Sequence, residues 1–108
     1  MSGQSNITPG EPISYMGLTA QDEHGETIGS ISDVLYDETT QEPEWLVVKP
    51  GTLRAEHFVP TTGAYTTEEG NVVLAFTKQM VKEAPKATGD HVITHDVEQE
   101  LREYYMVS

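Results

Sequence analysis

Two histidines four residues apart, His91 and His95, are the side chains best placed to bind a metal ion, because Asp90 and Asp96 flank them. In an α-helix, residues i and i+4 lie on one side, and imidazole is a common zinc ligand. The intervening segment 92–94 instead favours an extended chain, in which residues four apart lie roughly 13 Å from one another. We therefore expect surface or helix-capping histidines, and we keep a small metal- or ligand-binding barrel as an alternative hypothesis.

Motifs for nucleophilic or phosphate chemistry are missing from the sequence. The chain has no cysteine, which excludes thiolate metal sites, disulfides and cysteine nucleophiles. It has no G-x-S-x-G frame and no glycine-rich phosphate loop. Neighbouring carboxylates such as Asp22-Glu23 and Glu68-Glu69 fall in expected turns, where nothing would separate their pKa values for acid and base roles. We expect a protein that is not an enzyme and that needs no cofactor.

The elements that must position these side chains are organised around three consecutive strands between residues 28 and 60. Ile28 to Tyr36 is rich in β-branched and aromatic residues and ends at a polar loop, residues 37–44. Trp45 to Val48 is apolar at every position, which is typical of a strand buried on both faces. Pro50-Gly51 fits a type II turn, and a third strand, Ala55 to Val59, is closed by Pro60.

Shorter elements are expected on either side of this core. Residues 1–12 are polar and are predicted to be a flexible lead-in, and residues 13–108 form one domain. The pattern predicts a first strand at 13–19, a turn at Gly25, a weak strand at 63–67, a turn at 68–71 and a strand at 72–76. Thr77 should cap a single helical turn that Pro85 prevents from continuing.

The last expected element is an amphipathic helix at 96–105, capped by Thr94 or Asp96. Its apolar side chains are Val97, Leu101, Tyr104 and Tyr105. The strands are too closely spaced in sequence for parallel crossovers. The expected fold is mainly β: a small barrel of about six short antiparallel strands with a C-terminal α-helix, in which that helix or a second protomer covers part of the outer surface.

The order of these motifs resembles the PRC-barrel family. The shared features are a glycine-containing turn followed by Ile28-Gly29-Ser30-Ile31-Ser32-Asp33-Val34, the apolar strand Trp45 to Val48, and the strand end Phe58-Val59-Pro60. The resemblance covers roughly Ser14 to Pro85. We expect local structural roles for three signature positions: Gly29 bends a strand, Asp33 hydrogen-bonds within the neighbouring turn, and Pro60 ends a strand at a sheet edge.

The resemblance implies an adaptor rather than a catalyst. Related barrels form the cytoplasmic part of the photosynthetic reaction-centre H subunit and the second domain of a ribosome-maturation factor. We expect neither role to transfer, because this chain lacks the transmembrane helix of the first and the N-terminal domain of the second. A ribosome- or RNA-processing-associated factor that acts through protein contacts stays a further alternative.

The charge of the chain narrows the possible partners. Eighteen acidic residues against six Lys and Arg give a formal net charge of −12, without a dense basic patch. Direct binding to nucleic acid or to an anionic membrane is therefore disfavoured. No run approaches the ~20 apolar residues of a membrane helix, and no signal peptide precedes the domain, so we expect a cytoplasmic protein without membrane insertion.

Association with a second copy is the interaction that the composition favours. The hydrophobic fraction is only 36%, which leaves few residues to form a core, while two strands are apolar on both faces. A homodimer would cover the apolar surface that remains, and an unidentified protein partner could bind there too. The candidate interface residues are Trp45, Val47, Val73, Leu101, Tyr104 and Tyr105.

Overall fold

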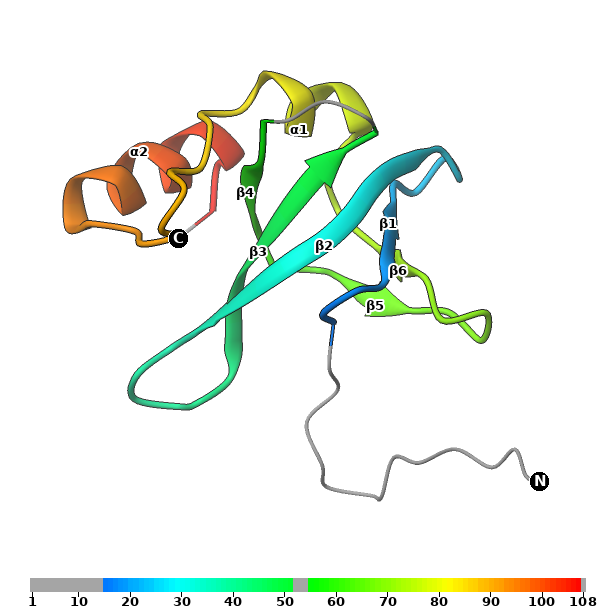
Figure 1. Cartoon of the computed structure of the whole chain (residues 1–108), viewed down its shortest axis with the longest axis horizontal. Coiled ribbons are helices and arrows are strands. Elements are labelled where there is room, and N and C mark those ends of the chain that lie inside the picture. Colours follow the sequence, from blue (N-terminus) through cyan, green and yellow to red (C-terminus); the bar gives the residue numbers. More distant parts are fainter. Residues whose placement is uncertain (1–14, 52–54, 108) are drawn as a thin grey trace.

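The computed structural model describes residues 15–51 and 55–107. The expected lead-in at 1–12, the start of the expected first strand at 13–14 and residues 52–54 lie outside the described residues. The described elements are six strands and two helices (Figure 1): β1 (Thr19–Gln21), β2 (Thr27–Tyr36), β3 (Pro43–Pro50), β4 (His57–Pro60), β5 (Tyr65–Thr66), β6 (Val72–Val73), α1 (Lys78–Glu83) and α2 (His95–Tyr105).

The six strands form one mixed sheet in the order β4-β3-β2-β1-β6-β5, which curls into a half-barrel (Figure 1). The mainly β fold with a C-terminal helix is therefore confirmed. The expectation of purely antiparallel pairing is wrong at one place, because β1 pairs with β6 in parallel, Ala20 opposite Val72. Strand spacing did not forbid this pairing, since all of β2 to β5 lies between the two strands and provides the crossover.

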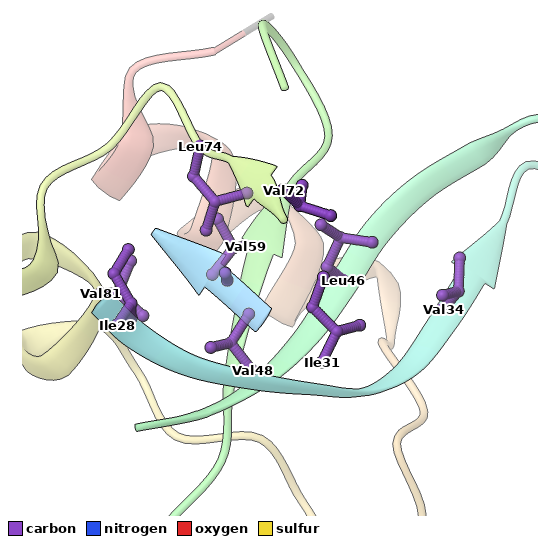
Figure 2. Close-up of a cluster of buried hydrophobic side chains, with 10 residues drawn as sticks. Ile28, Ile31, Val34, Leu46, Val48, Val59, Val72, Leu74 and Val81 are labelled. Carbon is purple, nitrogen blue, oxygen red and sulfur yellow. The ribbon is translucent and has the colours of Figure 1, made fainter. Parts of the chain in front are cut away.

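The inner face of the curled sheet holds the first of two hydrophobic cores (Figure 2). Three of its buried side chains come from β2 at a spacing of three residues, Ile28, Ile31 and Val34. A regular strand would turn successive members of such a series to opposite faces. Register shifts against β1 and β3 interrupt the alternation of β2, which places all three side chains in the same core. The other buried members of this core are Ala20, Leu46, Val48, Val59, Val72, Leu74 and Val81.

The predicted central strand is confirmed, because Trp45 to Val48 lies within β3, between β2 and β4, and all four side chains are buried. The first strand lies later than predicted. Gly17, with φ +84°, and the hydrogen bond from Leu18 N to Tyr15 O make a turn there, so the strand begins at Thr19. The strand predicted at 72–76 is limited to its first two residues in β6.

Both predicted helices are present and their caps explain where they begin. The hydroxyl of Thr77 accepts a hydrogen bond from Met80 N, and that of Thr94 accepts one from Val97 N. The cap of α2 is therefore Thr94 rather than Asp96, and His95 is the first residue of the helix. No helix in the described ranges is long and apolar enough to cross a membrane.

Candidate functional site

A bridge of charged side chains joins three distant parts of the chain. His91 Nδ1 lies 2.8 Å from Asp33 Oδ2, and His91 Nε2 lies 2.8 Å from Glu56 Oε1. The other oxygen of Glu56 accepts a hydrogen bond of 2.6 Å from the Ser32 hydroxyl. The imidazole is thus held between two carboxylates, and we call Asp33, Glu56 and His91 the histidine bridge.

Local backbone structure brings the three residues of the histidine bridge together. Asp33 lies on β2 at the register shift against β3, and Glu56 directly precedes β4. His91 has a left-handed backbone, with φ +56°, and its N–H donates to Thr88 O. Asp90 stabilises the same turn by accepting a hydrogen bond from Val92 N. This conformation is uncommon outside glycine, although histidine adopts it more readily than most residues.

The histidine bridge shifts the protonation of all three of its members. Hydrogen bonds with Glu56 and Asp33 raise the pKa of His91. The contact with His91 lowers the pKa of Asp33, and the Ser32 hydroxyl followed by His91 lowers the pKa of Glu56. The side chains remain 20–32% exposed, so water reaches the bridge and screens part of its energy.

This geometry suits an ion-pair bridge better than a catalytic relay or a metal site. Both ring nitrogens of His91 face carboxylates, and the Ser32 hydroxyl donates to Glu56, so no ring nitrogen is directed at the hydroxyl. Across residues 15–51 and 55–107, no group of three or more His, Asp or Glu side chains could hold a metal ion. His91 and His95 are not on one helix, because α2 starts only at His95.

The sequence did not reveal the histidine bridge. Asp33 was expected to bond within a neighbouring turn; one of its oxygens does accept from Val34 N, but the other contacts His91, 58 residues away. Glu56 is 35 residues from His91. No local spacing signals contacts of this range, and the unusual backbone of His91 has no sequence signature.

The second hydrophobic core lies where α2 packs on the sheet, beside β3 and β4 (Figure 1). Four of the predicted interface residues belong to it: Trp45 and Val47 from β3, with Leu101 and Tyr105 from α2. We call the part of this core that the sheet contributes, Trp45, Val47 and Phe58, the outer face. Phe58 and Ala84 complete the cluster. Tyr104 is partly buried against it, and Val73 is buried in β6 outside both cores. In this structure the predicted interface residues pack within their own chain.

Polar contacts fix the orientation of α2 on the outer face. Tyr105 Oη donates to Phe58 O at 2.7 Å, and Tyr104 Oη donates to Met80 O at 2.6 Å. Burial raises the pKa of Tyr105, which therefore remains a neutral donor. The Arg102 guanidinium lies 5.7 Å from the centre of the Trp45 ring and bonds Glu44 at 2.9 Å. The indole N–H of Trp45 is buried and has no acceptor within the described parts of the chain.

A hollow of about 590 Å³ lies between the β1–β2 turn and α1 and has a mixed lining. Three acidic side chains, Asp22, Glu26 and Glu83, line it together with Lys78 and Lys82. Asp22 is buried, and its oxygens accept hydrogen bonds from the N–H groups of His24, Glu26 and Lys78. The hydrogen bonds of Asp22 are therefore used within the fold.

Comparison with known proteins gives one result that bears on the whole fold. The family model for the PRC-barrel domain matches residues 14–81. No curated protein matches the chain. The matched range includes all six strands and most of α1, while the histidine of the bridge and all of α2 lie beyond it.

Proposed function

This chain belongs to the PRC-barrel domain family, and from that premise we propose that it is a non-enzymatic interaction module that associates with a second copy of itself. We propose that the protein acts in the cytoplasm. The observation that carries the proposal is the outer face, an apolar surface on a small barrel that is covered by a helix lying beyond the range matched by the family.

The covering helix is a separate element that a second copy could supply. Residues 85–94 join α1 to α2 without a helix or strand of their own, apart from a single bridge between Lys86 and His57. A connection of this kind allows two chains to exchange identical helices at little cost, because each outer face receives the same contacts. Five of the predicted interface residues, all except Val73, would then make between two chains the contacts that they make within one chain here.

The composition of the outer face and of the helix that covers it supports a role in binding. Aromatic residues and arginine are enriched at the centres of protein interfaces, and Trp45, Tyr104, Tyr105 and Arg102 gather here. An acidic exterior, with a net charge of −12, favours a basic surface on any other protein partner.

Sedimentation at micromolar concentrations in moderate salt is the direct test. The proposal expects a species of twice the chain mass whose fraction grows with concentration. A monomer throughout the micromolar range would reject self-association. Salt must be present in this experiment, because two copies that each carry a net charge of −12 repel one another at low ionic strength.

Cross-linking identifies the surface used. The chain has no native cysteine, so Met80→Cys combined with Tyr104→Cys places the only thiols on two contacting residues, one in α1 and one in α2. A flexible thiol-reactive cross-linker should join two chains if helices are exchanged, and should act within one chain if they are not. Tyr104→Cys alone is the matched control, since it can report only proximity of two α2 helices.

A further inference from the structure

His91 is positioned to control the attachment of α2. The segment 85–94 leads from α1 to α2, and its described contacts with the sheet region include Ala87 N to Glu56 O at 2.7 Å and the two contacts of His91. His91 makes the last of these polar contacts before the helix, which begins four residues later, and Ile93 between them packs against the second core. The histidine bridge therefore connects the end of this segment to β2 and to the residue that precedes β4.

We propose that the histidine bridge is a pH-sensitive latch: with a doubly protonated His91 it holds α2 on the outer face, and loss of one proton from His91 loosens the helix and exposes that face. The latch operates within a single chain. It therefore goes beyond the proposed self-association and does not depend on it.

The chemistry of imidazole supports this role. An ionised carboxylate can only accept hydrogen bonds, so two carboxylates at 2.8 Å from Nδ1 and Nε2 require a proton on each nitrogen. Neutral imidazole carries only one proton. After deprotonation, one nitrogen lone pair would face a carboxylate oxygen, and that contact would change from attractive to repulsive. His91 is also in a left-handed backbone conformation that the bridge helps to hold.

The charges around His91 favour its protonated form. Asp33 faces it from β2 and Glu56 from the chain before β4, while Asp90 is its neighbour in sequence. A hollow of about 350 Å³ beside His91 is also lined by Glu38, Glu44, Glu98 and the phenol of Tyr36, and Glu44 and Glu98 are paired with Arg102 of α2. Lys49 of β3 is a cation that acts on Glu56 in this region.

The direction of the pH effect follows from the raised pKa of His91. A histidine whose pKa is higher when latched stabilises the closed state fully below its ordinary value of 6.5 and loses this effect as the pH rises through the higher, latched value. Asp33 and Glu56, whose pKa values are lowered, weaken the latch only in acid, below their ordinary values of 3.8 and 4.5. The latch should therefore be strongest between pH 4.5 and 6.5.

Trp45 provides the measurement, because it is the only tryptophan and lies under α2. Quenching of its fluorescence by acrylamide, at protein concentrations too low for association, reports how often α2 opens. Between pH 6.5 and the latched pKa, the open fraction should rise by up to about tenfold per pH unit, because opening releases one proton. The His91 ring resonances in NMR should titrate over the same pH range. Unchanged quenching from about pH 6 to pH 9 would overturn the latch.

Two variants separate titration of His91 from other effects. His91→Asn keeps a residue that tolerates the left-handed backbone but cannot span both carboxylates. It should show raised quenching throughout and no pH dependence in this range. His95→Gln, four residues further along and exposed, is the control and should behave as the native chain. A native-like pH profile in His91→Asn contradicts the latch.

Glu56→Gln keeps the test decisive if His91→Asn does not fold. With only Asp33 left beside His91, the pKa of His91 should fall. The midpoints of the NMR titration and of the quenching curve should then both move to lower pH. A purely structural role for Glu56 would change the quenching level without moving the midpoint, and that result would refute the latch. Failure of the latch leaves the sedimentation result unaffected, and a strictly monomeric protein could still carry the latch.

Discussion

At Gly29 the backbones of β2 and β3 approach so closely that no side chain fits. A Cβ built there would lie 2.0 Å from Lys49 O and 2.8 Å from Pro50 Cα, and both are backbone atoms that cannot rotate away. We predict that Gly29→Ala destabilises the fold by about 1–3 kcal/mol or more, through separation of the two strands. Urea denaturation measures this. Gly89→Ala is the matched control, because nothing lies within 4 Å of its position, and it should change stability by less than about 0.5 kcal/mol.

Asp22 connects the β1–β2 turn to the start of α1 through three backbone N–H groups. Burial opposes its ionisation, but the hydrogen bonds from Glu26, Lys78 and His24 outweigh burial and lower its pKa. We predict that Asp22→Ala costs about 1–3 kcal/mol at neutral pH, because buried donors lose their acceptor. The lowered pKa means that the charge stabilises the fold above pH 3.8 and that this effect fades as the pH falls through the folded-state value.

The control for Asp22 is its exposed neighbour, Glu23→Ala, which should leave stability nearly unchanged. Denaturation midpoints of the three proteins, compared at neutral pH and in acid, check both parts of the prediction. If Asp22→Ala lowers stability by the same amount in acid as at neutral pH, the carboxylate charge has no part in the effect.

At the scale of elements, the sequence predicted what local chemistry decides. Proline, glycine and capping threonines mark the ends of strands and helices, so α1, α2 and the turn at Gly25 were correctly predicted. The register shifts in β2 and the parallel pairing of β1 with β6 were not, because each depends on strands that are distant in sequence. The histidine bridge was missed for the same reason.

The burial of most candidate interface residues could be predicted from the sequence, but their arrangement could not. Apolar periodicity correctly assigned Leu101 and Tyr105 to the buried side of a helix, and consecutive apolar residues correctly assigned Trp45 and Val47 to a strand buried on both faces. Periodicity carries no information on which surface a helix covers. It therefore could not distinguish α2 packed on its own sheet from α2 packed on a second chain.

The contribution of α2 can be measured with one substitution on each side of the helix. Leu101 is fully buried against the outer face, and Leu101→Ala should cost about 2–5 kcal/mol by removing the side chain and leaving a cavity. Glu100→Ala, on the exposed side, should change stability by less than about 0.5 kcal/mol. Urea denaturation followed by circular dichroism gives both values. Equal effects of the two substitutions would show that α2 does not pack as described.

At the scale of the whole molecule, charge is the dominant property. Eighteen acidic side chains on a chain of 108 residues repel one another, and this repulsion opposes the compact state. Salt shortens its range, from about 10 Å at 0.1 M to about 3 Å at 1 M. The same salt weakens the ion pairs of His91 and Arg102, but partly exposed pairs contribute at most about 1 kcal/mol each. When salt is added, the stability gained from weaker repulsion should therefore exceed the stability lost from weaker ion pairs.

We predict that the melting temperature rises by several degrees between about 0.05 M and 1 M sodium chloride. Salt also strengthens apolar burial in any protein, so the decisive comparison is with a less acidic variant. Glu68→Gln with Glu69→Gln removes two exposed charges from the turn between β5 and β6, which lies apart from the histidine bridge and from Arg102. Its melting temperature should be higher at low salt and should rise less steeply. Parallel salt curves for the two proteins would mean that the acidity does not destabilise the folded chain, which would favour a basic partner as its reason.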